Sequence, residues 1–406
     1  MKRVAIVGGG LAGLSCAYSL KVHGIDTTVF DAASKPGGRD TAAFYLLAPD
    51  LFRNTFQLID RLGLAGEVIA IPPHAGQVYK RSIYHHRVAS ATGLLSFKGL
   101  NIVDKALLPR MAYLLARHAS HLDFHDPARG LQFDNETVAS LVKRELSQNV
   151  LNYVAGPLIS TLFSYGSDQT SAWLYLILAK HMNNVRMSTV RGGMQRVAAA
   201  LSRELRVVTG CEIRHVETDG ETYIVAGENF SDLVVAVGGD TVLKIAGIDG
   251  LLSDEDRQFF RGCRYQRVVG VQVGTARPLD GRCYAVSIPL VENLSASTIS
   301  FHDYIDPSAV PNGEGLLTIS GGGSSVTSVQ LLDDLKKLYP VEPLWTEIVE
   351  WNPGTPKFPP GRYREIAEFQ QRKRRPGLFF CGDYLLGPFI EGAITTGLQA
   401  AKVIST

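Results

Sequence analysis

Residues 3–13, RVAIVGGGLAG, decide the fold of this chain. RVAIV is a short, apolar and β-branched run of the kind that is buried in a parallel sheet. The glycines that follow match the pattern G-x-G-x-x-G, and Leu14, Ala17 and Leu20 then recur at helical spacing. A strand, a glycine turn and a helix in this order are typical of a fold that binds a dinucleotide.

Each glycine of this turn has a separate task. Gly8 permits the tight turn, Gly10 lets the backbone approach a pyrophosphate, and Gly13 lets the helix lie close to the strand. The start of the helix, at Leu11 and Ala12, offers unpaired N–H groups and a partial positive charge to the phosphates. We therefore predict that a diphosphate binds at this turn.

Two further residues support a nucleotide site. The second strand, TTVFD, ends at Asp31, 18 residues after Gly13, where a carboxylate can accept hydrogen bonds from ribose hydroxyls. Ala32 follows it directly. Arg39 closes the run KPGGR, and a guanidinium can bind phosphate oxygens through two parallel hydrogen bonds. A solvated surface arginine is the alternative interpretation.

The stretch VAIVGGGLAGLSCAYSL…TTVFDAASKPGGR resembles the N-terminal signature of the flavin amine oxidase, protoporphyrinogen oxidase and phytoene desaturase superfamily. In that family a G-G-R sequence, here ending in Gly38 and Arg39, brings the arginine to the FAD phosphates. The resemblance therefore implies FAD rather than NAD. The family continues with an extended segment beneath the flavin, whereas residues 40–44 pass almost directly into an expected helix. Either the floor of the flavin site is built differently here, or a loop is missing from the sequence.

The C-terminal region resembles the second FAD motif of the same family. LFFCG, residues 378–382, reads as a buried strand, and the helical pattern EGAITTGLQAAKVI follows. In the family Gly382-Asp383 contacts the ribityl or phosphate region, and the helix start at Ile390, Gly392 and Ala393 faces the flavin pyrimidine. A helix N-terminus there would stabilise the negative charge of the reduced flavin. Asp383 could equally be a helix cap.

The middle of the chain adds a third segment. Residues 190–247 read as a helix, a hairpin and a buried strand, and they resemble the G-G-M element and strand pair of the family. The residue matching Ile213 packs there against the adenine. The segment 350–363 contains Trp351, a candidate cofactor contact, and lacks the cysteine that attaches FAD covalently in some relatives. The resemblance therefore implies non-covalent FAD.

These segments predict an α/β protein with two domains. A Rossmann-like FAD-binding domain with a parallel sheet is expected to be discontinuous in sequence. A second, α+β domain with a mixed sheet and helices is expected to bind the substrate, because residues 100–188 read as helices and residues 266–322 as alternating strands. The expected boundaries are 1–75, 190–262 and 365–406 for the first domain, and 76–189 and 263–364 for the second.

Composition excludes several other classes of protein. Lysine plus arginine is 41 and aspartate plus glutamate 39, so the net charge of +2 gives no reason to expect nucleic acid as a partner. The five cysteines are scattered and contain no C-x-x-C, which argues against disulfides and zinc and favours the cytoplasm. His118, His121 and His125 could suggest a metal site, but the stretch LDFHDP is expected to leave the helix, so we interpret these histidines as a polar helix end. We expect no metal.

No run of about 18 apolar residues predicts a membrane-spanning helix, so peripheral membrane contact is the form of membrane association left open. A homodimer also stays open.

We expect the cofactor, rather than a side chain of the protein, to carry out the chemical step. No spacing of serine, cysteine and histidine suggests a nucleophilic triad, as expected where flavin N5 accepts a hydride. We predict an FAD-dependent oxidoreductase, protoporphyrinogen oxidase- or desaturase-like, that dehydrogenates a C–C or C–N bond of a fairly apolar small molecule, with O2 or a quinone as electron acceptor. Specific catalytic residues are not identified. Candidates for the pocket wall are Phe163, Tyr165, Tyr384 and Phe389.

The sequence leaves three alternative functions open. A flavin amine oxidase is disfavoured because Phe389 stands where those enzymes carry a tyrosine of their aromatic cage, and no lysine matches the one they place near N5. An NAD(P)-dependent dehydrogenase would need neither Arg39 nor Asp383. A non-catalytic FAD-bound scaffold would share every binding motif.

Overall fold

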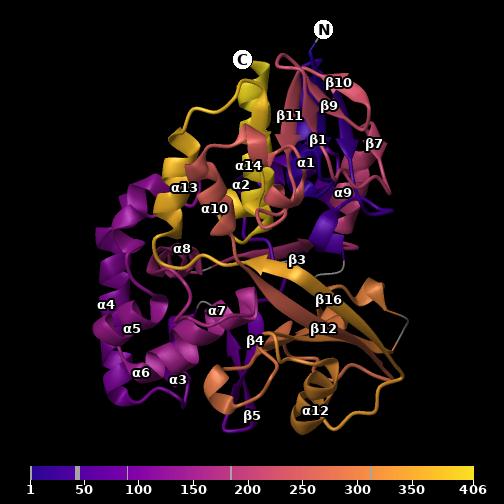
Figure 1. Cartoon of the computed structure of the whole chain (residues 1–406). Coiled ribbons are helices and arrows are strands. Elements are labelled where there is room, and N and C mark those ends of the chain that lie inside the picture. Colours follow the sequence, from indigo (N-terminus) through magenta and orange to yellow (C-terminus); the bar gives the residue numbers. More distant parts are fainter. Residues whose placement is uncertain (1, 42–45, 89, 183–184, 311–312) are drawn as a thin grey trace.

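The computed structural model describes residues 2–41, 46–88, 90–182, 185–310 and 313–406. Two large sheets organise the chain, one built around the N-terminal strand and one around the long strands β12 and β16 (Figure 1). Both ends of the chain lie at the same end of the molecule, where the Lys2 ammonium donates to the carbonyl oxygen of Ile404 at 2.5 Å (Figure 1). The predicted class, α/β with a parallel sheet and a mixed sheet, is confirmed.

The first sheet is five-stranded and parallel throughout. Its order is β17 (Leu378–Phe380), β11 (Asp232–Val235), β1 (Arg3–Val7), β2 (Asp26–Phe30) and β7 (Val207–Val208). Helices α1 (Leu11–Val22) and α14 (Ile390–Ser405) pack against each other beside it. A Cβ at Gly397 would overlap the carbonyl oxygen of Ala12, so the two helices approach as closely as backbone allows. The N-terminal and C-terminal motifs therefore belong to one layer.

The predicted hairpin within residues 206–225 is wrong in part. Val207 and Val208 pair in parallel with β2 and extend the first sheet. The antiparallel pairing begins later, in a small three-stranded sheet of β8 (Glu217–Thr218), β9 (Tyr223–Val225) and β10 (Glu228–Phe230). The reason is that the open edge of the parallel sheet satisfies the backbone groups of this short apolar run before a local partner does.

The second sheet has seven strands. Its order is β16 (Trp345–Pro356), β12 (Tyr265–Thr275), β15 (Gly315–Gly322), β14 (Thr298–Phe301), β13 (Ala285–Ser287), β4 (His74–Tyr79) and β5 (Ser82–Arg87). The pair β13 and β4 is parallel and the other pairs are antiparallel. The four strands predicted within residues 266–322 are present, whereas β4, β5 and β16 were not predicted. One face of this sheet packs on α12 (Ser328–Leu338).

Helices make up most of the chain between β5 and residue 187. They are α3 (Ala91–Ser96), α4 (Ile102–Arg117), α5 (Val138–Glu145), α6 (Gln148–Val150), α7 (Gly156–Phe163) and α8 (Ala172–Met182). Within the region predicted to be helical, residues 100–188, the helical structure is interrupted after α5, because Ser147 adopts an extended conformation and its hydroxyl accepts from the N–H of Val150 to start α6. A π-helical turn at Leu151–Ala155 then joins α6 to α7.

The remaining elements connect these layers. They are α2 (Arg53–Arg61), β3 (Val68–Ile71), β6 (Met187–Val190), α9 (Gln195–Arg203), α10 (Asp254–Arg261), α11 (His302–Ile305) and α13 (Arg362–Gln371). The largest hydrophobic core joins the first sheet to the helical segment, and a second core lies between the seven-stranded sheet and α12. Within the described ranges, no helix is long and apolar enough to cross a bilayer.

Two expectations are not tested by the fold. The domain boundaries remain a prediction. The short connection after Arg39 includes residues 42–45, which lie outside the described residues.

Candidate functional site

A cavity of about 570 Å³ lies between the carboxyl ends of the parallel strands and one face of the seven-stranded sheet. Ligands of open parallel sheets bind beyond the carboxyl ends of the strands, which is where this cavity lies. Most residues predicted to contact the cofactor line it: Gly8, Gly10, Leu11, Ala12, Asp31, Ala32, Gly38, Arg39, Ile213, Trp351, Gly382, Asp383, Ile390 and Ala393. Segments from the beginning, middle and end of the chain thus meet at one cavity.

The glycine turn has the geometry that its sequence predicts. Gly8 adopts a φ of +115°, and its N–H donates to the carbonyl oxygen of Phe30 at 2.8 Å. A Cβ at Gly10 would meet no atom within 4 Å, so the space above this residue is open. A Cβ at Gly13 would overlap the carbonyl oxygen of Gly8, so this glycine lies behind the cavity and sets the distance between helix and strand. Helix α1 has no side-chain cap, which leaves its first N–H groups facing the cavity.

Asp31 holds the turn as well as lining the cavity. One carboxylate oxygen accepts from the N–H of Gly9 at 2.6 Å, and the other accepts from the N–H of Ala33 at 2.7 Å. These bonds fix the carboxylate at the end of β2. Asp31 therefore has a structural role in addition to the predicted contact with ribose.

Arg39 connects the two sheets at the middle of the cavity. Its guanidinium donates to Asp383 Oδ2 at 2.8 Å and to the carbonyl oxygen of Gly354 in β16. It also lies over the ring of Tyr265, 5.3 Å from the ring centre. Burial raises the pKa of Tyr265 well above its ordinary value, and its oxygen accepts from the N–H of Gly239 at 2.8 Å. A neutral tyrosine thus supports the cation from below.

The start of α14 forms another part of the wall. The N–H of Gly382 donates to Thr396 Oγ1 at 2.9 Å, which anchors the turn after β17 to the helix. A Cβ at Gly392 would overlap the carbonyl oxygen of Gly387, so Gly392 serves this turn rather than the cavity surface. Phe389 lines the cavity, and its ring packs within 6.0 Å of the rings of Phe52, Phe124 and Phe163.

A buried carboxylate at the start of α14 was not predicted as a site residue. Glu391 is 0% exposed and accepts from the N–H groups of Asn54 and Thr55, both at 2.9 Å, and from the Thr55 hydroxyl at 2.7 Å. Helix α2 has no side-chain cap of its own, so Glu391 takes that role from across the core. The available signal in the sequence was an acidic residue in the first turn of a helix whose following residues are mostly apolar or small.

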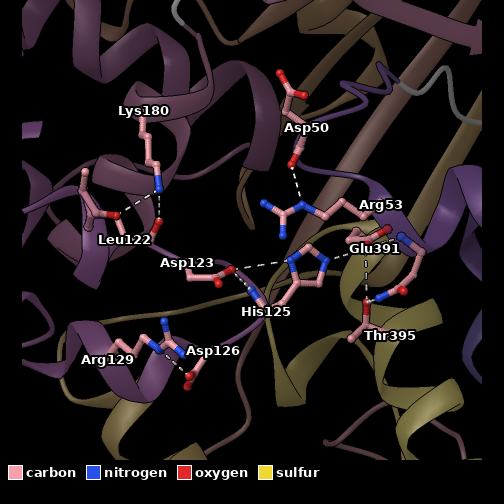
Figure 2. A network of polar contacts seen from close by, with 12 residues as sticks. Asp50, Arg53, Leu122, Asp123, His125, Asp126, Arg129, Lys180, Glu391 and Thr395 are labelled. Atoms are coloured by element: carbon pink, nitrogen blue, oxygen red, sulfur yellow. Dashed lines mark hydrogen bonds and ion pairs between the residues drawn. The ribbon is translucent and has the colours of Figure 1, made fainter. Parts of the chain in front are cut away.

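His125 completes this network from the helical segment. Its Nε2 lies 2.6 Å from Glu391 Oε1, and Figure 2 shows the imidazole between Glu391 and Asp123. The loop that carries His125 is fastened to α8 by Lys180, which donates to the carbonyl oxygen of Leu122 at 2.5 Å (Figure 2). His125 therefore contacts a carboxylate of α14 rather than converging with His118 and His121 on a metal.

The other aromatic candidates occupy different positions. Tyr165 lines a second cavity of about 210 Å³ next to the first. Phe163 and Tyr384 are buried in the core, Phe163 behind Phe389 and Tyr384 against Phe259 and Phe260. Of the four predicted wall residues, Phe389 is the one that borders the large cavity.

One group of potential metal ligands occurs among the described residues, at His85, Asp280 and Cys283. Asp280 Oδ2 accepts from the hydroxyl of Tyr339 at 2.7 Å and lies 2.7 Å from His85 Nε2. Burial raises the pKa of Cys283 to about 12, so the thiol is protonated at neutral pH. These groups satisfy one another, and we assign no metal to them.

The cavity fits FAD at the points that can be checked. Open space lies above Gly10, the uncapped start of α1 faces it, and Arg39 provides a cation beside it. These features suit a diphosphate. The start of α14 borders the same cavity as the glycine turn, so one extended dinucleotide could contact both elements.

Comparisons with known proteins agree with this geometry. Residues 11–405 match the family described as flavin-containing amine oxidoreductases. The mitochondrial protoporphyrinogen oxidase of Nicotiana tabacum is 55% identical over 491 aligned positions, which cover 99% of this chain and 94% of that protein. The alignment is longer than the 406 residues of this chain, so the tobacco protein has segments that this chain lacks. The coproporphyrinogen III oxidase of Staphylococcus aureus is 25% identical over 182 residues, 42% of this chain and 38% of that protein.

Solved structures share the fold. A protein described as a putative protoporphyrinogen oxidase from Exiguobacterium superposes with a TM-score of 0.80 at 14% identity, covering 100% of this chain and 98% of the other. A putrescine oxidase variant superposes with a TM-score of 0.79 at 17% identity, covering 99% and 98%. At these identities the likeness concerns the fold alone.

Proposed function

Because this chain belongs to the family of flavin-containing amine oxidoreductases, we propose that it dehydrogenates a reduced cyclic tetrapyrrole of the protoporphyrinogen type. The protein is an FAD-dependent oxidoreductase, and the substrate is the proposed part. The observation that carries the proposal is the 55% identity to the tobacco protoporphyrinogen oxidase across nearly the whole chain, including the segments that line the cavity.

The residues of this chain would bind the cofactor and orient the substrate. Bound FAD would supply the hydride acceptor, N5 of the flavin. The turn at Gly8 and Gly10 and the guanidinium of Arg39 would hold the diphosphate, and the first turn of α14 would face the flavin ring. Gly382 and Asp383 would complete the cofactor site. These roles are proposals for the residues that line the cavity.

The substrate side of the cavity suits an apolar ring system. Leu162, Val268, Trp351 and Phe389 present apolar or aromatic surface to it, and they come from α7, β12, β16 and the start of α14. Such walls exclude water and place a flat molecule by contact. Orientation and exclusion of water are what a hydride transfer requires of the protein.

Other parts of the proposal concern the surroundings of the enzyme. We expect O2 or a quinone to take the electrons from the reduced flavin. We expect a cytoplasmic protein, with peripheral membrane contact and a homodimer as arrangements to be examined. Oxygen consumption by the purified holoprotein tests the electron acceptor, flotation with lipid vesicles tests membrane contact, and sedimentation tests whether it forms a dimer.

The decisive experiment mixes protoporphyrinogen IX with an excess of the purified holoprotein without oxygen, because conversion to protoporphyrin IX releases six electrons and each flavin accepts two, so about three flavins are consumed per substrate molecule. We expect the visible flavin absorbance to bleach as the fluorescence of protoporphyrin IX appears. A holoprotein that is photoreduced normally but oxidises no porphyrinogen contradicts the proposed substrate. Bleaching by putrescine or another amine, and not by porphyrinogen, would identify an amine oxidase instead.

A further inference from the structure

Four hydroxyl side chains gather on the face of the seven-stranded sheet that borders the cavity. Thr298 and Ser300 lie on β14 and Thr318 and Ser320 on β15, and all four line the cavity. We name these four residues the hydroxyl patch. Thr298 is opposite Ser320 and Ser300 is opposite Thr318 across the antiparallel pair. Because directly opposed side chains lie about 5 Å apart, the four hydroxyls form one compact group.

The alternation of the strands explains which residues face the cavity. Successive side chains of a strand point to opposite faces of its sheet. Ile299 and Ile319 are fully buried in the core on the α12 side, whereas their neighbours in sequence line the cavity. The core therefore determines the register of the two strands, but it does not require hydroxyls on the other face, where valine would suit the strand equally well.

The hydrogen bonds of the patch leave donors available to a ligand. The hydroxyl of Thr298 donates to the carbonyl oxygen of Val286 at 3.3 Å. Thr318 Oγ1 lies 2.7 Å from His302 Nε2. The hydroxyls of Ser300 and Ser320 make no hydrogen bond with any residue that the structure describes. Hydroxyl groups that line a cavity and have no hydrogen-bond partner in the protein are suited to recognise a ligand.

His302 controls the direction of one of these donors. It follows β14 directly, at the start of α11, and burial lowers its pKa to about 4, so the imidazole is neutral near neutral pH. When Nε2 carries the ring proton, it donates to Thr318 Oγ1. The hydroxyl of Thr318 is then free to donate its own proton into the cavity.

Among the described residues of its sheet, the cross-strand partners of the patch are uncharged. Gln272 pairs with Thr318 in the next strand, and Ser287 pairs with Thr298. The described basic residues that line the cavity are Arg39, Arg214 and Lys244, which come from the segments around the parallel sheet. Any oxygen held at the patch is therefore held by hydrogen bonds rather than by an ion pair.

We propose that the hydroxyl patch is the subsite that recognises an oxygen-bearing edge of the substrate, a carboxylate or a carbonyl, through donated hydroxyl hydrogen bonds. The apolar rings of the same molecule lie against Leu162, Val268 and Phe389. His302 is a positioning residue that orients Thr318. The inference rests on the proposed function and specifies how its substrate is held.

The test compares Thr318→Val with Thr318→Ser in the holoprotein. Loss of one hydrogen bond to the substrate raises KM for protoporphyrinogen IX about five-fold and leaves kcat within about two-fold. Thr318→Ser keeps the hydroxyl and stays near the wild type. Thr346→Val, which removes an exposed hydroxyl of β16 in the same sheet, is the matched control. Equal KM values for Thr318→Val and the wild type overturn the inference.

A double-mutant cycle tests the role of His302. His302→Leu raises KM to the same extent as Thr318→Val, and the double variant is no worse than either single variant, because both changes remove one interaction. Additive effects overturn the positioning role. Flavin content and spectrum, measured on every variant, show that the cofactor site is intact.

Substrate chemistry separates hydrogen bonding from ion pairing. The dimethyl ester of protoporphyrinogen IX keeps carbonyl acceptors and loses both charges, so its KM stays within about three-fold of that of the acid. A more than ten-fold weaker ester would show that a cation dominates recognition and would overturn the inference.

A binding assay keeps the result independent of turnover. Quenching of protoporphyrin IX fluorescence gives a Kd for each variant. Wild-type binding without turnover contradicts the proposed function, and the Kd values then decide the role of the patch by the same comparison. Absence of wild-type binding to both the acid and the ester overturns the patch inference as well.

Discussion

Replacing Glu391 with alanine is expected to destabilise the protein strongly, because this carboxylate accepts hydrogen bonds from several donors in a fully buried position. It accepts from the N–H groups of Asn54 and Thr55, from the Thr55 hydroxyl, and it lies 2.6 Å from His125 Nε2. The side chain is 0% exposed. Each buried donor that loses its partner costs about 1–3 kcal/mol. Relaxation and entry of water offset part of the sum, so we expect a loss of about 3–5 kcal/mol.

The assay is urea unfolding in the presence of the same excess of FAD for all variants, since a bound cofactor raises apparent stability. Glu391→Gln keeps one acceptor oxygen but turns an NH2 group toward donors, so it is expected to lie between the wild type and Glu391→Ala. Glu368→Ala, on the exposed side of α13, is the control and should change stability by less than about 0.5 kcal/mol. A Glu391→Ala variant within about 1 kcal/mol of this control would refute the reasoning.

A second readout connects the network to the cofactor. Glu391 follows Phe389 and Ile390, which line the cavity, and it fixes the first turn of α14 to α2 and to the loop of His125 (Figure 2). Loosening this turn should weaken FAD binding in Glu391→Ala, measured as loss of visible flavin absorbance on dialysis. Unchanged FAD retention would show that the network supports the core without positioning the flavin wall.

Other changes test separate parts of the site. Arg39→Met should weaken FAD about 10- to 100-fold by titration, because it removes a charged donor and leaves Asp383 facing the diphosphate, whereas the exposed Arg203→Met should not. Gly13→Ala should yield protein without bound flavin, since its Cβ overlaps the carbonyl oxygen of Gly8; a yellow variant contradicts the predicted turn. Burial lowers the pKa of His302 to about 4, so the unfolded state binds the proton more readily and stability falls as pH drops from about 6.5 toward 4. Between about pH 7 and pH 5, the free energy of unfolding should fall by about 2 kcal/mol more in the wild type than in His302→Leu; equal decreases in the two proteins would refute this reasoning.

Much of the cofactor site could be predicted from the sequence because its elements are local. A strand, a glycine turn and a helix follow one another within residues 3–22, and the steric demand on Gly13 arises from the carbonyl oxygen of Gly8 in the same turn. The C-terminal motif around Gly382 is local in the same way. Resemblance to a family then linked these segments to one cofactor, and they do meet at one cavity.

The aromatic candidates show where local patterns lose their value. Phe163, Tyr165, Tyr384 and Phe389 were equally plausible as walls, and one of them borders the large cavity. Which face of a helix or turn meets a cavity depends on the packing of segments distant in sequence. The strand β16 was missed for the same reason, because its partner β12 comes from another part of the chain. The strands β4 and β5 form a local hairpin, but its turn residues are Lys80 and Arg81, which are not the residues that usually mark such a turn.

The sequence by itself determined that this chain binds a dinucleotide through its first strand and turn, because the strand, the glycine turn and the helix that such a site needs follow one another directly along the chain. Only the tertiary structure decided how segments that are distant in sequence come together around the cavity. Glu391 meets His125, Arg39 meets Asp383, and Thr298 and Ser300 of β14 lie opposite Ser320 and Thr318 of β15, although the sequence separates these segments. Such contacts are set by the register of a sheet and the close packing of helices, which no short stretch of sequence encodes.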